Sequence, residues 1–89
     1  MDNTTLETAQ KIKKEMRESS NLIDHYKDCV AKMKQNIEKE VVPSTRVNGI
    51  EKWEHYLPIK AIYVEIMLNL QLAEENEKLR VLTAQFKNL

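Results

Sequence analysis

The sequence predicts an all-α protein: an antiparallel helical hairpin, or coiled coil, of two long helices, with the second helix kinked or broken near Pro58. In the first half of the chain, apolar residues recur at alternating spacings of four and three, the period of a coiled-coil helix. The 89 residues include one glycine and two prolines, and 31% of them are charged. This composition is typical of long helices and excludes a turn-rich β-sandwich or a collagen-like chain.

The first predicted helix covers about residues 5–40. Thr4 and Glu7 match a capping box, in which each side chain accepts a hydrogen bond from the other residue's amide. A heptad seam then runs for about five heptads, through Thr5, Ala9, Ile12, Met16, Ser19, Ile23, Tyr26, Val30, Met33 and Ile37. Because the seam contains small polar residues and a tyrosine, with Leu22 and Cys29 beside it, it favours a helical bundle over a leucine zipper.

A connection is predicted over residues 41–49. Val42 precedes Pro43, and the proline ring disfavours the helical conformation of the residue before it. Asn48 and Gly49 form a dipeptide that commonly marks a turn. The first helix is therefore expected to end before Val42.

The second predicted helix covers about residues 50–88, with Asn48 and Glu51 positioned to cap its start. Pro58 lies inside the helical pattern, where it removes a backbone donor and clashes with the preceding turn, so a break is expected there. The whole chain, residues 1–89, is predicted to be a single helical-hairpin domain, because this length supports one small core at most.

Residues 56–73 are apolar nearly all the way round the predicted helix, with Lys60 and Glu65 as the only charges. A helix that is apolar on every side must be covered on every side, and the first helix can cover one face. We place the first helix against the longer heptad line, which consists of Leu68, Leu72, Leu79, Leu82 and Phe86. The remaining residues are the predicted partner-binding surface: Ile59, Ile62, Tyr63, Ile66 and Leu70.

These patterns predict a non-enzymatic protein–protein interaction module, a small coiled-coil subunit or chaperone-like adaptor that docks an apolar helix face on a partner. The partner is a different protein or a second copy bound through the second helix. One alternative is a structural subunit of a kinetochore- or tether-like assembly, where short coiled-coil chains are common. Another is a co-chaperone, because the size and hairpin layout are similar to those of the small co-chaperones of type III secretion needle subunits, a similarity of architecture alone.

Neither a catalytic site, a metal site nor a cofactor site is predicted. His25 and Cys29 stand four residues apart, as do Asp24 and Asp28, but a structural zinc site needs four ligands. Bringing His55 to this pair would require one particular register of the hairpin. The simpler interpretation is a semi-buried cysteine with both histidines at helix edges. The sequence also lacks the phosphate-loop, dinucleotide and zinc-protease motifs.

Charge disfavours nucleic acid as a partner, since the chain has 14 basic and 14 acidic residues. One local basic cluster comprises Lys11, Lys13, Lys14 and Arg17. It is interrupted by Glu15 and Glu18, so pairing within the helix is the favoured interpretation. The apolar stretch is shorter than the ~20 residues that span a bilayer, so no membrane span is predicted. A single cysteine and the lack of a signal-peptide pattern favour an intracellular, cytoplasmic location.

Overall fold

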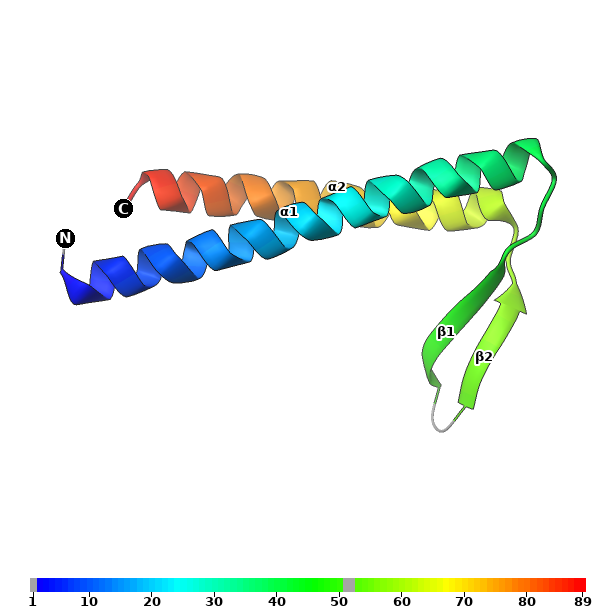
Figure 1. Ribbon diagram of the computed structural model, residues 1–89, viewed down its shortest axis with the longest axis horizontal. Helices are drawn as coiled ribbons and strands as arrows, with labels where there is room; N and C mark the ends of the chain where they lie inside the picture. Colours follow the sequence, from blue (N-terminus) through cyan, green and yellow to red (C-terminus); the bar gives the residue numbers. More distant parts are fainter. Residues whose placement is uncertain (1, 51–52) are drawn as a thin grey trace.

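The computed structural model describes residues 2–50 and 53–89, and within these the side chains of residues 2–46 and 56–89. It consists of α1 (Asn3–Glu38), β1 (Ser44–Ile50), β2 (Trp53–Pro58) and α2 (Ala61–Lys87). The helices lie side by side with both chain ends at the same end of the pair, so they run antiparallel (Figure 1). The prediction of two long, packed helices is confirmed, whereas the all-α class is wrong for the segment between them.

α1 begins two residues earlier than the proposed capping box would place it. Asp2 is the N-cap, and its carboxylate accepts a hydrogen bond from the Thr5 amide at 2.7 Å. This bond lowers the pKa of the Asp2 carboxyl. Thr4 lies inside the helix, so the predicted pairing of Thr4 with Glu7 is wrong. An aspartate cap satisfies a free amide and also places a negative charge at the positive end of the helix dipole.

α1 ends in a Schellman motif, the hydrogen-bonded turn that closes many helices. The Val41 amide donates to the Asn36 carbonyl at 2.9 Å, and the Glu40 amide donates to the Ile37 carbonyl at 3.2 Å. Glu40 has a positive φ of 55°, the left-handed conformation that this motif requires. Glycine usually occupies such a position because a Cβ atom is disfavoured there.

The seam predicted on α1 is the covered side as far as Met33, whereas Ile37, the last predicted seam position, is 37% exposed. Ile12, Ser19, Ile23 and Val30 are buried in it, and five further seam positions are half-buried: Thr5, Ala9, Met16, Tyr26 and Met33. On α2, seven covered positions repeat at spacings of four and three, and Val64 and Thr83 beside them are half-buried as well. The seven are Ala61, Glu65, Leu68, Leu72, Glu75, Leu79 and Leu82. Both helices therefore present a heptad seam to each other, as in an antiparallel coiled coil.

A polar contact interrupts the apolar seam near its middle. Ser19 is 2% exposed, and its hydroxyl donates to the Glu75 backbone carbonyl at 3.5 Å. The Glu75 side chain is largely covered, and its carboxylate lies 4.0 Å from the Lys78 ammonium group. Because a buried hydroxyl needs a partner, this contact favours one register of the two helices over its neighbours.

Between the helices lies a β hairpin, not the start of a second helix. β1 pairs antiparallel with β2 from Ser44 opposite Pro58 to Ile50 opposite Trp53, with a register irregularity after Val47. The predicted helix from residue 50 and its kink at Pro58 are therefore wrong, because Pro58 ends β2 and α2 starts at Ala61. The predicted Glu51 cap lies outside the described residues.

The hairpin follows from local chemistry in the segment that separates the helices. Thr45, Val47, Trp53 and Tyr56 are β-branched or aromatic, the residue types that favour extended strands. At the base of the hairpin, the Ile59 amide donates to the Pro43 carbonyl at 3.4 Å. The hairpin projects sideways from the end of the helical pair, and its described residues pack on neither helix (Figure 1).

The molecule is elongated and has little core. Its radius of gyration is 17.7 Å, whereas a compact chain of this length would have about 12 Å. Its accessible surface is 7255 Å2, against about 5,400 Å2 for a compact protein of this mass. Among the described residues, the buried apolar side chains are those of Ile12, Ile23, Val30, Ala61 and Leu82.

Truncating Ile23 tests the seam. Ile23 is 5% exposed, so Ile23→Ala should lower the free energy of unfolding by about 2–4 kcal/mol through lost burial and a residual cavity. The exposed Lys32 provides the control, and Lys32→Ala should change this free energy by no more than about 0.5 kcal/mol. Denaturant titrations of both variants give the comparison, and equal effects would show that the seam is assigned to the wrong side of α1.

Replacing Glu40 tests the helix end. Glu40→Gly removes the Cβ atom from a left-handed residue, so the variant should be more stable than the parent by about 1 kcal/mol. Glu40→Ala keeps the Cβ atom and should bring no such gain. Thermal unfolding followed by circular dichroism distinguishes these outcomes, and a matched gain in both variants would contradict the strain argument.

Candidate interaction surface

Five large apolar side chains form an exposed row on the first half of α2, which we call the outer face. Its members and their exposed fractions are Ile62 (51%), Tyr63 (57%), Ile66 (51%), Met67 (48%) and Leu70 (64%). Each of them has another member of the row three or four residues away, so they lie along one side of α2. Isolated exposed apolar residues are ordinary in proteins, whereas a contiguous group marks a candidate contact surface.

The outer face lies on the side of α2 opposite to α1. Leu70 is nine residues from both Ala61 and Leu79, which places it about 180° around the helix from these two seam positions. Ala61 is buried and Leu79 is half-buried against α1. The same seven-residue seam that joins α2 to α1 therefore leaves the outer face uncovered.

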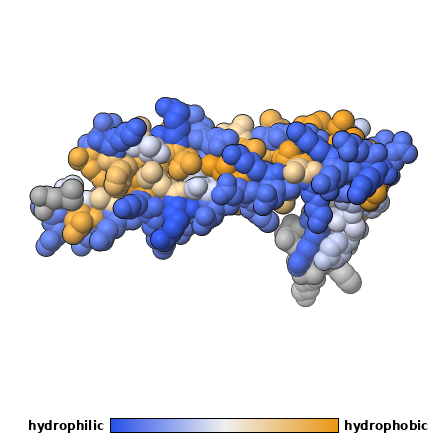
Figure 2. All heavy atoms as spheres, turned by 45° about the horizontal axis from the view of Figure 1, so that its top comes forward, coloured by the Kyte–Doolittle hydropathy of each residue, from blue (hydrophilic) through white to orange (hydrophobic). Residues whose placement is uncertain are grey.

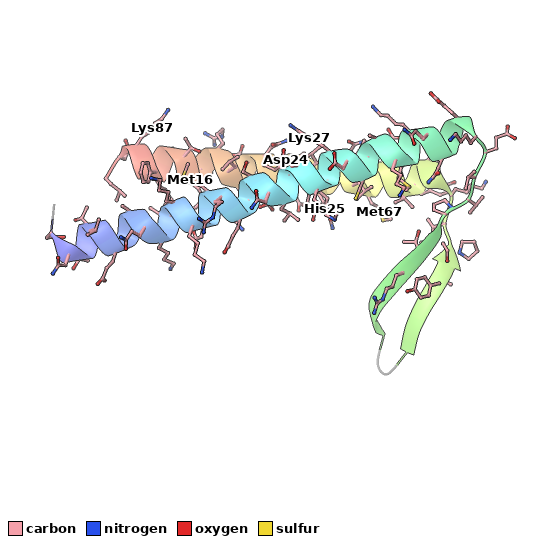
Figure 3. All side chains as sticks on the ribbon, viewed as in Figure 1. Met16, Asp24, His25, Lys27, Met67 and Lys87 are labelled. Carbon is pink, nitrogen blue, oxygen red and sulfur yellow. The ribbon has the colours of Figure 1, made fainter. Side chains whose placement is uncertain are left out.

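Four of the five residues predicted to bind a partner belong to this face: Ile62, Tyr63, Ile66 and Leu70. The fifth, Ile59, precedes α2 and is half-buried at the base of the β hairpin. Met67 completes the face but was not among the predicted residues. Its position four residues after Tyr63 is the signal that could have identified it. Met67 lies on the edge of the helical pair from which the β hairpin projects (Figure 3).

The heptad line expected against α1 is more covered. Leu68, Leu72 and Leu79 are half-buried and Leu82 is buried, while Phe86 near the chain end is 36% exposed. Helical periodicity therefore separated the covered side of α2 from its exposed side.

Apolar surface continues around the end of the helical pair. An open groove of about 510 Å3 is lined by Asn36, Ile37, Glu40, Val41, Val42, Lys60, Ala61 and Ile62. Ile62 belongs both to this groove and to the outer face. Val41 and Val42 are about half exposed, and hydrophobic side chains reach the surface near this end (Figure 2). The groove and the outer face are thus continuous.

Charged residues flank the outer face at both of its ends. Lys60 stands at the start of α2 as its N-cap, and Glu74 lies one turn beyond Leu70; both are exposed. The Lys60 side chain makes no capping hydrogen bond, and the first turn of α2 contains no acidic residue. Unpaired amides at the start of a helix carry partial positive charge, so a lysine there lacks electrostatic compensation.

Further along α2 the charges are paired with each other. The Arg80 guanidinium donates to both carboxylate oxygens of Glu77, at 2.9 and 2.6 Å. These bonds lower the pKa of the Glu77 carboxyl. The second half of α2 therefore presents this solvated ion pair together with separate exposed apolar side chains, such as Val81 (40%) and Phe86 (36%), whereas the contiguous apolar row lies in the first half.

The other residues considered in the sequence lie apart from this surface. His25 is exposed on α1 and Cys29 is half-buried, while the side chain of His55 lies outside the described residues. Within the described part of the chain, no three histidine, cysteine or acidic side chains cluster closely enough to hold a metal ion. In the same part of the chain, neither helix combines the length and apolar character needed to cross a membrane.

The basic cluster on α1 is a solvated face. Lys11, Lys13, Lys14 and Arg17 are all exposed. The Lys14 ammonium group lies 4.0 Å from the Glu18 carboxylate, one turn away. Pairing within the helix, the favoured interpretation of this cluster, therefore occurs at Lys14.

No protein-family model, no curated protein and no solved structure matches the chain. The outer face and the helices that hold it are therefore the features of this chain that bear on its function.

Proposed function

We propose that this protein is a non-catalytic protein–protein interaction module that docks the outer face of α2 on a protein partner. The observation that supports the proposal is the row of five half-exposed apolar residues on the side of α2 opposite to α1. A soluble chain gains free energy when such a row is removed from water. A protein surface with matching apolar side chains is the natural cover.

The size of the outer face supports a specific contact. Its five side chains expose on the order of 500 Å2 together, in the upper part of the range for the largest apolar patch of a monomeric protein. Tyr63 adds an aromatic ring with a hydroxyl group, a combination enriched at the centres of protein interfaces. The face is large enough for a cluster of anchor residues.

The rest of the fold holds this face in place. Side chains of α1 cover the opposite side of α2, so the five residues are presented on a supported helix about 12 Å long between Ile62 and Leu70. Presentation on a packed helix reduces the conformational entropy lost on binding. This arrangement suits a coiled-coil subunit of a larger assembly and a chaperone-like adaptor equally, because both bind through an apolar helix face.

Replacing the centre of the outer face tests the proposal. The double variant Ile62→Ser, Ile66→Ser should retain the helical circular dichroism and a cooperative melt, because both side chains point away from α1. It should lose self-association and binding of a fluorescent apolar dye, since central apolar anchors commonly carry about 2 kcal/mol or more of binding energy. Sedimentation at micromolar concentration and dye fluorescence give the two measurements.

A seam variant provides the matched control. Leu72→Ser introduces the same residue on the half-buried side of α2 and should lower the melting temperature. Loss of helicity in the double variant would show that Ile62 and Ile66 belong to the core of the hairpin. A parent chain that neither associates nor binds the dye would overturn the proposed function.

A further inference from the structure

We propose that the outer face is covered by the outer face of a second copy of this chain, in an antiparallel, two-fold symmetric pairing of two α2 helices. The inference rests on the proposed function and names the partner. It follows from the order of apolar and charged residues along α2. In a two-fold interface the same surface serves both copies, so each contact must occur twice.

Four of the five outer-face residues are arranged symmetrically about one point of the helix. Tyr63 and Leu70 lie at equal distances from the midpoint between Ile66 and Met67. If two α2 helices cross antiparallel at this point, Tyr63 of each copy lies opposite Leu70 of the other. Ile66 then lies opposite Met67 in the same way. All four positions contact apolar side chains, while Ile62, the fifth residue of the outer face, lies opposite Gln71 at the edge of the contact.

The flanking charges are complementary in the same arrangement. Lys60 lies about 10 Å along the axis on one side of the midpoint, and Glu74 lies about 11 Å on the other. The two residues are two heptads apart, so they differ by about 40° around the helix and share one side of the outer face. An antiparallel pairing therefore brings Lys60 of each copy to Glu74 of the other. A parallel pairing would instead bring like charges together.

Both charged groups are available for this contact. Within the described part of the chain, neither the Lys60 ammonium group nor the Glu74 carboxylate forms an ion pair or a side-chain hydrogen bond, and both residues are exposed. In the dimer, Glu74 of the second copy would stand near the uncapped start of α2. A negative charge there offsets both Lys60 and the positive end of the helix dipole.

The area is consistent with a stable dimer. The apolar part of the outer face exposes on the order of 500 Å2 in each copy, and a standard interface buries about 800 Å2 in each partner. The polar residues along the rim of the same helix supply the difference. Dimerisation would therefore bury exposed apolar residues of both copies without any additional helix or strand.

A charge exchange tests the pairing in the full chain. Lys60→Glu and Glu74→Lys should each raise the dimer dissociation constant by about three- to tenfold, because each places like charges together at both ends of the interface. Combining them restores opposite charges, so the double variant should return to within about twofold of the parent. Sedimentation equilibrium at low salt measures all three, since added salt screens the effect.

Lys27→Glu is the matched control, because Lys27 is exposed on α1 and lies away from the outer face (Figure 3). This variant makes the same charge change and should leave the dissociation constant unchanged. Single variants that dimerise like the parent would overturn the inferred pairing. A double variant weaker than either single variant would do so as well.

A cysteine at the centre of the crossing supplies a measurement that does not depend on charge. In a Cys29→Ser background, Ile66→Cys should form a disulfide-linked dimer on mild oxidation, because residue 66 of each copy lies beside the two-fold axis. Lys78→Cys in the same background is far from the axis and should remain monomeric in a denaturing gel. Equal cross-linking of both variants would contradict the crossing point.

The experiments separate this inference from the proposed function. A parent chain that is monomeric but binds the apolar dye through Ile62 and Ile66 would overturn the dimer and leave the proposed function standing. A parent chain that does neither would overturn both. A dimer with the expected charge exchange and cross-link supports both together.

Discussion

The seam between α1 and α2 is the contact on which the rest of the structure depends. Ile12, Ile23 and Val30 of α1 are buried in it, and Ala61 and Leu82 of α2 are their buried counterparts. Two helices can cover only one side of each other, so every other side of each helix remains at the surface. α1 has mostly polar residues on those sides, with Leu6 and Leu22 as separate exposed apolar residues, whereas the first half of α2 has five large apolar ones in a row. The elongated shape and the outer face are therefore two results of the same limited contact.

Much of the helical architecture could be predicted because heptad spacing is a repeated signal. Every position from Thr5 to Met33 that the spacing placed in the seam is covered, since errors at single residues average out over several turns. The β hairpin could not be recognised in the same way. The Asn48–Gly49 dipeptide is common both in loops that precede a helix and in the turns of β hairpins. It therefore does not distinguish between the two. The apolar residues from Trp53 to Leu57 were interpreted with helical periodicity, but Pro58 and the β-branched partner strand make the extended form the better one.

Most of the outer face was predictable for a similar reason. The error in its prediction also has a physical cause. Ile62, Ile66 and Leu70 share one side of α2 wherever the helix begins, because their relative angles depend only on spacing. Ile59 was misplaced because it depends on where the helix begins, and Pro58 with the hairpin delays that start to Ala61. Helical spacing predicts which side chains lack an intramolecular neighbour, but the identity of the covering surface depends on a second molecule.

The two-stranded hairpin and the helical pair also differ in their stability against local unfolding. Within the described residues it is a sheet of β1 and β2 alone, and it packs on neither helix. A pair of strands with no third layer is marginally stable in water, whereas opening either helix must disrupt the seam along its length. Local opening of the hairpin therefore leaves the helical pair intact. The backbone amides of the hairpin should consequently exchange their hydrogen for solvent deuterium long before the backbone amides around Ile23 do.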